Sequence, residues 1–283
     1  MRESHPGPAF AALAVATLLA CGAGGCRQSA GSYEDGLSSP VASLTRLGNG
    51  DVEAVLAPAD AVAEAVNGLD EFAGRAVAAR TIAVLGTRAM HLVTVPRARI
   101  YEIAELRGHL VSTGPAGSST ELTAERILRA AGLDPERDIR RQRLDINASI
   151  EALRGGSVDA FFWLAEDPSP DLRAVAQDPA TTLRLISTSS VLASLVEQYG
   201  RATYLRAEIP QGLYRNVIPI ATVGVRSVVV ARSDLPDDEA YALARRFAAL
   251  GAKRPSASGE RGGTPDSPAA LHPGAARFYD ERR

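Results

Sequence analysis

The segment Gly114–Glu121 carries the most specific chemical signal in the chain. Its sequence, GPAGSSTE, follows a predicted strand and opens a predicted helix over Ser119–Ala131. Backbone N–H groups in the first turn of a helix lack partners within the helix, and the helix dipole places positive potential there. The glycines allow a ligand to approach the backbone, and the hydroxyls of Ser118, Ser119 and Thr120 add donors. The segment therefore suits a carboxylate or a phosphate.

The same residues also have a purely structural interpretation. Ser118 followed three residues later by Glu121 fits the capping-box pattern, in which side chains satisfy the first turn of a helix without any ligand. No lysine follows Gly117, so the segment is not the phosphate loop of nucleotide-binding proteins. From this segment alone, an anion site and a helix cap both remain open.

Catalytic chemistry finds little support in the sequence. The four histidines are scattered and no pair has the spacing of metal ligands. There is no Gly-x-Ser-x-Gly motif for a serine nucleophile. Both cysteines, Cys21 and Cys26, lie near the N-terminus, which leaves the body of the chain without a thiol for catalysis or metal binding. We expect a protein that is not an enzyme and that holds neither a metal nor a cofactor.

The segment Phe161-Phe162-Trp163 stands out because only 5% of the residues are aromatic. It lies in a predicted buried strand, so core packing is the first explanation. Alternation along a strand sends Phe162 to one face and Phe161 and Trp163 to the other. Ligands of open α/β sheets collect beyond the carboxyl ends of the strands. Trp163 and the following Glu166 are therefore candidates for lining a cleft, although core packing is the preferred interpretation.

The N-terminus predicts export. Ala9–Ala20 is apolar apart from Thr17, which is too short for a bilayer span of about 20 residues. It fits the hydrophobic region of a secretory signal peptide. The following Leu-Leu-Ala-Cys resembles a bacterial lipobox, which makes Cys21 the predicted lipidation site and Cys26 a weaker candidate. The alternative is an ordinary signal peptide with an incidental cysteine. Lipidation at Cys21 would anchor the protein to the cell envelope.

Composition and patterning predict an α/β protein. The chain has 283 residues, 46% of them apolar, which is ample for a buried core. Lys and Arg number 31 against 33 acidic residues, without a basic stripe, so a nucleic-acid partner is not expected. Short apolar runs alternate with helical patterns, as in sheets with parallel strands. The predicted strands are Val52–Leu56, Thr81–Leu85, His91–Val95, Leu110–Ser112, Ala160–Leu164, Leu183–Ser187 and Ala221–Ala231. The predicted helices are Ala59–Val66, Ile103–Leu106, Ser119–Ala131, Asn147–Arg154 (with Asn147 as its cap) and Asp237–Leu250.

Several segments, taken in order, resemble one known family. They are Asp51–Leu56 with Asp60 and Ala65–Gly68, Ile103–Gly108 with Val111 and Gly114–Glu121, Gly156 with Asp159–Phe162 and Pro168, Ile209–Tyr214, and Leu271–Tyr279. Together they resemble the TAXI family of solute-binding receptors of tripartite ATP-independent periplasmic (TRAP) transporters. The resemblance extends from about Ser43 to Tyr279. Each motif is loose, but their number, order and spacing make the match specific.

The resemblance implies a two-lobe fold like that of type II periplasmic binding proteins. Two α/β lobes joined by crossing strands would close around a small organic anion, a carboxylate or an amino acid. A TRAP membrane permease would recognise the closed form. The implied ligand contacts are Gly117, Ser118, Ser119 and Thr120, together with Tyr33, Trp163, Glu166 and Tyr214. The predicted organisation is 1–20 signal peptide, 21–36 tether, 37–107 and 219–283 lobe one (with a mobile segment over 253–270), and 108–218 lobe two.

The chain also departs from the family pattern. Too few residues precede Ser43 for the strand, loop, long helix and second strand of family members, so lobe one is expected to lack its first βαβ piece. The family's Gln before Asp60 is Pro58 here, a glycine of the loop is Ser119, and an acid stands at Glu166. Two functions therefore remain: an extracytoplasmic receptor that feeds a TRAP permease, and a receptor-like lipoprotein detached from transport that serves as a sensor or interaction partner.

Overall fold

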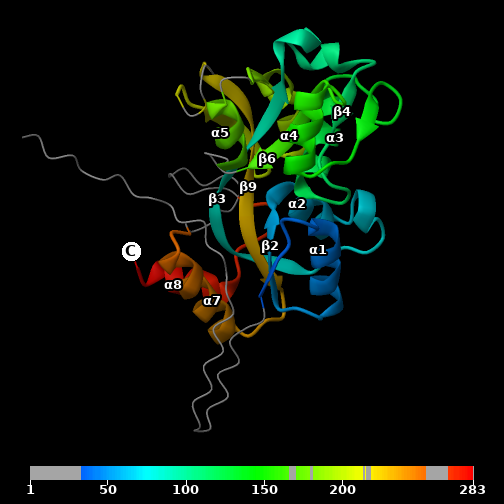
Figure 1. Cartoon of the computed structure of the whole chain (residues 1–283). Coiled ribbons are helices and arrows are strands. Elements are labelled where there is room, and N and C mark those ends of the chain that lie inside the picture. The colour runs from blue at the N-terminus through cyan, green and yellow to red at the C-terminus, as the bar shows by residue number, and fades with distance from the viewer. Residues whose placement is uncertain are drawn as a thin grey trace, which may run out of the picture. The chain divides into compact units, whose positions relative to one another are not determined.

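Two long antiparallel strands organise the molecule. β3 (Ala79–Thr94) has 16 residues and β9 (Ile220–Arg232) has 13. They are hydrogen-bonded in register from Ala79 opposite Arg232 to Ala89 opposite Gly224. In Figure 1 both strands run through the upper and lower groups of helices, so the two groups share a single sheet.

The computed structural model describes residues 33–165, 170–178, 181–212, 214, 218–252 and 267–282. The remaining strands are β1 (Tyr33–Asp35), β2 (Ala54–Pro58), β4 (Leu110–Ser112), β5 (Arg140–Gln142), β6 (Ala160–Ala165), β7 (Arg184–Ile186) and β8 (Tyr204–Ile209). The α-helices are α1 (Pro40–Asn49), α2 (Ala59–Asn67), α3 (Ser119–Ala130), α4 (Ile146–Gly155), α5 (Pro170–Gln177), α6 (Leu192–Tyr199), α7 (Asp237–Ala249) and α8 (Pro273–Asp280). A 3₁₀-helix, Ile103–Leu106, precedes β4.

The sheet is mixed. Its strand order is β1-β2-β9-β3-β6-β4-β5, with β7 also paired to β3 and β8 to β9. The β1–β2, β4–β5 and β4–β6 pairs are parallel, whereas every pair that includes β3 or β9 is antiparallel. Parallel strands need crossover connections, and helices supply them here, as in other α/β folds.

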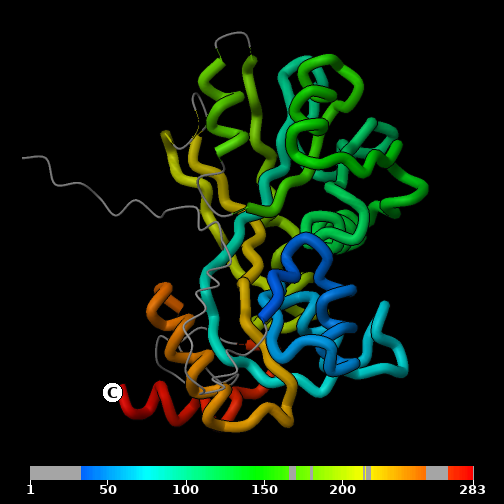
Figure 2. Tube along the Cα trace, turned by 60° about the horizontal axis from the view of Figure 1, so that its bottom comes forward, coloured from blue at the N-terminus to red at the C-terminus, as the bar shows by residue number. Residues whose placement is uncertain are grey.

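The buried apolar residues divide the molecule into two lobes along β3 and β9. The buried apolar residues of β3 up to Val84, and those of β9 from Val228 onward, pack either with α1 and α2 or with α7 and α8. From Ala89 in β3 and up to Val225 in β9, they pack with α3 and α6 or with α4 and α5. We call the first group lobe one and the second lobe two; the colours of Figure 2 follow the chain from lobe one to lobe two and back. This confirms the expected two-lobe α/β fold.

The start of lobe one contains elements that the sequence did not predict. The described chain opens with β1, α1 and β2, and β1 pairs in parallel with β2, so a βαβ unit is present at this point. Ser43 lies inside α1, in a stretch for which the sequence predicted no helix. Ahead of Ser43, the described residues form only the three-residue β1 and the first turn of α1. Pro40 at the first position and Gly50 in the left-handed conformation at the end delimit α1.

Other boundaries also differ from the predictions. Thr81–Leu85 and His91–Val95 belong to one strand, β3, whose polar middle and irregular pairing near Gly86 interrupt the apolar pattern. The cap of α4 is Asp145, whose side chain accepts a hydrogen bond from the Ala148 N–H at 2.8 Å, and not Asn147. The strands β1, β5 and β8 and the helices α1, α5, α6 and α8 were not predicted.

The predicted mobile segment, 253–270, is only partly described. Residues 253–266 lie outside the described residues. Residues 267–270 pack against β3: the Thr81 hydroxyl donates to the Ala269 carbonyl at 2.9 Å and lies 2.5 Å from the Ser267 hydroxyl. Backbone and side-chain hydrogen bonds therefore attach this last part of the segment to the sheet.

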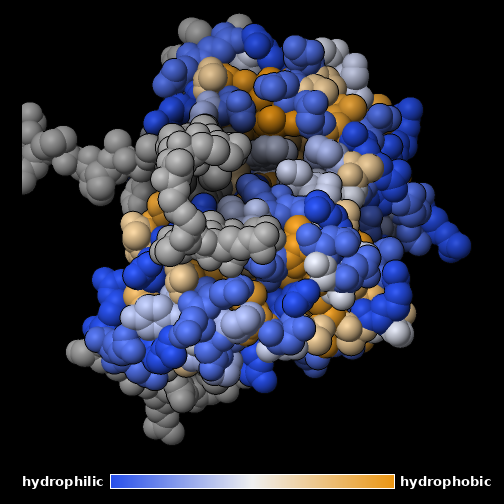
Figure 3. Space-filling model, turned by 90° about the horizontal axis from the view of Figure 1, so that it is seen from below, coloured by the Kyte–Doolittle hydropathy of each residue, from blue (hydrophilic) through white to orange (hydrophobic). Residues whose placement is uncertain are grey.

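The described surface is mostly hydrophilic on the face drawn in Figure 3. Hydrophobic residues form small separate groups in that view. The exposed large apolar side chains, Leu69, Tyr101, Ile218 and Leu250, are distant from one another in sequence. In the part of the chain that the structure describes, no helix combines the length and apolar character needed to cross a bilayer.

Helices α7 and α8 meet closely at their N-termini. His272 caps α8: its Nδ1 accepts the Gly274 N–H at 3.2 Å. Burial lowers the pKa of the His272 imidazole, while the carboxylate of Asp237, 3.7 Å away, acts in the opposite direction. A Cβ atom on Gly274 would lie 2.0 Å from the Asp237 carbonyl oxygen. Only glycine therefore permits this approach of the two helices.

We predict that Gly274→Ala lowers the free energy of unfolding by about 3 kcal/mol, since overpacking against backbone forces the helices apart. Gly155→Ala, at the end of α4, is the matched control because its Cβ would meet no atom within 4 Å. It should be neutral or stabilise the protein by at most about 1 kcal/mol. Urea denaturation followed by circular dichroism measures both; equal stabilities would contradict the role assigned to Gly274.

Candidate functional site

The carboxyl ends of parallel strands from both lobes meet at the middle of β3 and β9. In lobe two, β6 ends at Ala165, which pairs with Ala89 of β3. In lobe one, β2 ends at Pro58, which pairs with Ser227 of β9. These pairings fall where the apolar clusters change from one lobe to the other. We call this region the lobe boundary; it is the edge at which open α/β sheets bind ligands.

The predicted anion loop opens α3 at this boundary. Ser118 is the N-cap, and its hydroxyl accepts the Glu121 N–H at 3.2 Å. The Gly117 N–H donates to the carboxylate of Glu121 at 2.6 Å. Ser118 therefore caps α3, but the reciprocal bond of the predicted capping box is not formed. The Glu121 carboxylate accepts the Gly117 N–H, whereas the Ser118 N–H donates to the Pro115 carbonyl.

The next two hydroxyls of the loop are buried and occupied. Ser119, 1% exposed, donates from its hydroxyl to the Leu37 carbonyl, which belongs to lobe one. Thr120 accepts the Leu164 N–H of β6 at 3.3 Å. Ser119 therefore connects the lobes directly, whereas Thr120 fixes α3 to the sheet of lobe two.

Glu121 also belongs to a charged cluster beside the loop. Arg141 contacts the carboxylates of Glu121 at 2.6 Å, Glu125 and Glu136, and its Nε donates to the Thr113 hydroxyl at 2.9 Å. Arg143 contacts Glu121 at 2.6 Å and Glu136 at 3.0 Å. The cluster holds Glu121 in the position from which it reaches the Gly117 amide.

Tyr33 lies apart from the loop. Its ring packs edge-on against Phe247 of α7, with the ring centroids 5.2 Å apart, among the apolar residues that α7 and α8 cover. Burial, together with the nearby Asp35 carboxylate, raises the pKa of its phenol. The structure thus places Tyr33 and the loop Gly117–Thr120 in different environments.

Trp163 and Tyr214 lie with His91 in lobe two. Trp163 is opposite His91 in the β6–β3 pair, and the Tyr214 hydroxyl lies 2.9 Å from His91 Nε2. The predicted alternation is confirmed: Phe161 and Trp163 pack in the cluster under α4 and α5, and Phe162 packs in the one under α3. Glu166 and Cys21 lie outside the described residues.

A buried ionic network at the lobe boundary was not predicted. Arg126 of α3 contacts the carboxylates of Asp60, at 3.2 Å, and Glu64, both from α2. The hydroxyls of Thr123 and Tyr204 donate to Asp60 Oδ2 at 2.9 and 3.0 Å. Asp60 is 0% exposed, Glu64 2% and Arg126 2%. The network links lobe one to lobe two away from water.

The titration behaviour of this network follows from its burial. Burial and the Asp60 carboxylate raise the pKa of the Tyr204 phenol well above its usual value, which keeps the hydroxyl protonated as a donor. Burial alone would lower the pKa of the Arg126 guanidinium, but the neighbouring Tyr204 and Asp60 outweigh it and raise the pKa. One signal for the network existed in the sequence: Ser119, Thr123 and Arg126 recur at the spacing of one helix face.

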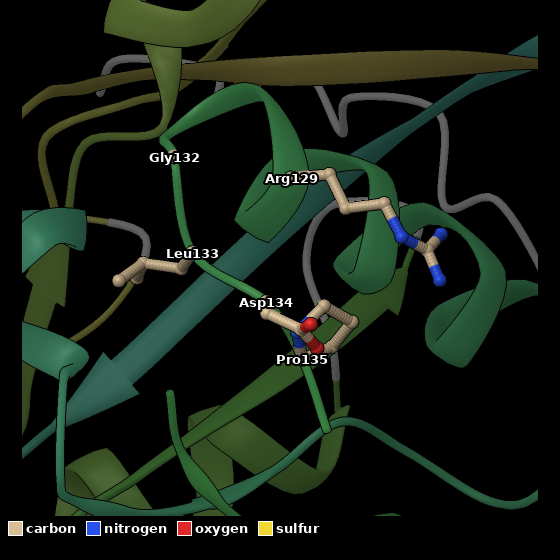
Figure 4. Close-up of a pocket in the computed structure, with 5 residues that line it drawn as sticks. All are labelled: Arg129, Gly132, Leu133, Asp134 and Pro135. Carbon is tan, nitrogen blue, oxygen red and sulfur yellow. The ribbon is translucent and has the colours of Figure 1, made fainter. Parts of the chain in front are cut away.

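The other chemical possibilities are limited in the described part of the chain. No group of three or more His, Cys, Asp or Glu side chains there is arranged to hold a metal ion. Figure 4 shows a shallow pocket at the C-terminal end of α3, the opposite end from Ser118. It is lined by Arg129, Gly132, Leu133, Asp134 and Pro135, none of which is a predicted site residue.

The chain belongs to the NMT1-like family, whose model matches residues 35–282. Among solved structures, it is similar to the periplasmic aliphatic sulphonate binding protein SsuA from Escherichia coli, with 17% identity and a TM-score of 0.41 over 75% of this chain and 54% of that one. It is also similar to PhnD1 from Prochlorococcus marinus in complex with methylphosphonate, with 12% identity and a TM-score of 0.46 over 75% and 68% of the two chains.

A further similar structure is an ABC transporter periplasmic binding protein from Brucella ovis with glutathione bound. The identity is 12% and the TM-score 0.41, over 74% of this chain and 51% of that one. The match thus spans about half the length of the Brucella and Escherichia proteins. The Escherichia and Brucella proteins are both described as periplasmic binding proteins.

The two arginines of the charged cluster should differ in their importance. The Arg141 side chain is 5% exposed and that of Arg143 46%. Arg141→Gln should lower the free energy of unfolding by roughly 3 kcal/mol, because it removes the buried partner of Glu121, whose side chain is only 11% exposed and keeps only the more exposed Arg143. Arg143→Gln, the control, should cost less than about 1 kcal/mol, as for exposed ion pairs. Urea denaturation compares them; an equal loss in both variants would refute the distinction.

Proposed function

We propose that this protein is an extracytoplasmic solute-binding lipoprotein that captures a small organic anion, a carboxylate or an amino acid, at the lobe boundary. The observation that carries the proposal is the position of the α3 N-terminus. This N-terminus lies at the carboxyl ends of the lobe-two strands, and the Ser119 hydroxyl donates to the Leu37 carbonyl of lobe one. The membership of the NMT1-like family and the likeness to periplasmic binding proteins agree with this class of function.

In this proposal the lobes open and close about β3 and β9. We place the boundary between Val84 and Ala89 in β3 and between Val225 and Val228 in β9, where the apolar clusters change. This is earlier in β3 than the boundary near Arg107 that the sequence suggested. Two crossing strands form a hinge that allows closure around a ligand. The closed state would be the form that a TRAP-type permease recognises.

We rank the proposed ligand contacts by the neighbours of each residue. Gly117, Ser118, Ser119 and Thr120 are the contacts for the anion, because their amides and hydroxyls start α3 at the boundary. Trp163 and Tyr214 flank the cluster around His91 and would contact the non-ionic part of a solute, as would Glu166. Tyr33 could take part only after leaving Phe247.

One observation favours the second function, a receptor-like lipoprotein detached from transport. The loop hydroxyls and the Gly117 amide have partners within the protein, and the ionic network joins the lobes without a solute. Such a protein would act as a sensor or an interaction partner at the cell envelope. Solute binding distinguishes the two functions, since only the first requires it.

A thermal-shift screen of the mature domain against small carboxylates and amino acids tests the proposal. A ligand at 100 times its dissociation constant should stabilise the fold by about 2.7 kcal/mol. Ser118→Ala combined with Ser119→Ala should weaken binding by roughly 1–3 kcal/mol through lost charge-assisted hydrogen bonds. Glu102→Ala is the control, because it removes the cap of the 3₁₀-helix Ile103–Leu106, which precedes β4, whereas the loop follows β4. An affinity that the double variant leaves unchanged would refute the loop assignment.

Lipid anchoring at Cys21 gives a separate prediction. Cys21→Ala should move the protein from the membrane fraction to the soluble envelope fraction, because the lipid on this cysteine is the proposed attachment. Cys26→Ala should leave the protein in the membrane fraction and serves as the control. Immunoblots of fractionated cells provide the measurement. Retention of the Cys21 variant in membranes would rule out this cysteine as the anchor.

A further inference from the structure

The ionic network at the lobe boundary has the composition of an occupied carboxylate site. Lobe two contributes donors only: the Arg126 guanidinium and the hydroxyls of Thr123 and Tyr204. Lobe one contributes acceptors only, the carboxylates of Asp60 and Glu64. A planar guanidinium supplemented by hydroxyls is the arrangement that binds carboxylates strongly.

We infer that Asp60 and Glu64 act as a built-in dicarboxylate ligand of lobe two, which closes the lobes on Arg126 in the absence of solute. A solute carboxylate would reach Arg126 only by displacing them. The inference rests on the proposed function, since it concerns the same boundary and the same class of ligand. It goes beyond that function by assigning the carboxylate receptor and its internal competitor.

The geometry at Asp60 supports this assignment. Its Oδ2 atom accepts two hydrogen bonds, from Thr123 at 2.9 Å and Tyr204 at 3.0 Å, and lies 3.2 Å from the Arg126 guanidinium, which itself donates to the Tyr204 hydroxyl. Its Oδ1 atom accepts the N–H of Ala61 at 2.9 Å, which fixes the carboxylate at the start of α2. Glu64 lies one helical turn further and contacts the other amino group of Arg126. One guanidinium therefore holds two carboxylates that a single helix presents together.

The charge balance makes the internal ligand displaceable. The network places two acids, Asp60 and Glu64, against one base, Arg126, in a region without water access. An unbalanced buried charge is costly, whereas the same carboxylates are well solvated once the lobes separate. Opening therefore returns α2 to water and leaves the donors of α3 and β8 available to a solute. The internal ligand therefore competes with a solute for Arg126 and does not hold the lobes closed permanently.

Isothermal titration calorimetry with glutarate, whose two carboxylates resemble this pair, tests the inference. Asp60→Asn with Glu64→Gln removes both internal charges with little change in shape. This variant should bind glutarate at least ten-fold more tightly than the wild type, and adding Arg126→Gln should abolish the gain. Glutaramide, the uncharged analogue, should not bind. Small-angle X-ray scattering without ligand should show a larger radius of gyration for the double variant.

Two matched controls keep the result specific. Glu34→Gln removes a lobe-one carboxylate that pairs with Arg46 of the same lobe, and Arg129→Gln removes an exposed arginine of α3. Both should bind glutarate as the wild type does. If circular dichroism shows that the double variant does not fold, Glu64→Gln alone is the substitute, because Asp60 keeps its donors in it. Since one of the two internal carboxylate charges is removed, this variant should bind glutarate at least three-fold more tightly than the wild type.

The outcomes separate the inference from the proposed function. If the wild type binds glutarate or another organic anion but the charge-neutral variant shows no gain, the inference is wrong and the proposed function stands. Binding that survives Arg126→Gln likewise overturns the inference. If neither the wild type nor the variant binds any probe of the screen, both the inference and the proposed function fail.

Discussion

The structure depends on the continuous pairing of β3 with β9. Their backbone hydrogen bonds extend from Ala79–Arg232 to Ala89–Gly224, through the point where the apolar clusters of lobe one give way to those of lobe two. The lobes therefore cannot separate without bending these two strands. Register irregularities lie beside this point, between Thr81 and Ala83 and between Val84 and Gly86. Such irregularities interrupt a ladder locally and increase its bend.

The contacts that join the two lobes beside these strands are mainly polar. Each lobe has its own apolar clusters, so closure adds chiefly hydrogen bonds and ion pairs, among them Ser119 with Leu37 and Arg126 with Asp60. Breaking such contacts costs little free energy when both partners become hydrated together. The two arrangements can then lie close in free energy, a condition for a binding protein whose lobes respond to a solute.

The elements that the sequence predicted well are those with strong local signals. α3 is delimited by Ser118 and Gly132, and the alternation of Phe161, Phe162 and Trp163 identifies the faces of β6. β3 was predicted as two strands because its middle, at the hinge, is polar. The loop of the candidate site was found because its residues are contiguous. The ionic network was not, because Asp60 and Tyr204 are 144 residues apart and only folding joins them.

One departure from the TAXI motif that the loop resembles has a physical role at the boundary. Where that motif has a glycine, Ser119 supplies a hydroxyl that donates to the Leu37 carbonyl of lobe one. On the same face of α3, Thr123 and Arg126 reach Asp60. The loop and the network thus use successive turns of one polar face of α3. Leu37, which follows β1, and helix α2 provide the partners from lobe one. A change that loosens either contact should shift the balance between closed and open lobes, even where it touches no solute.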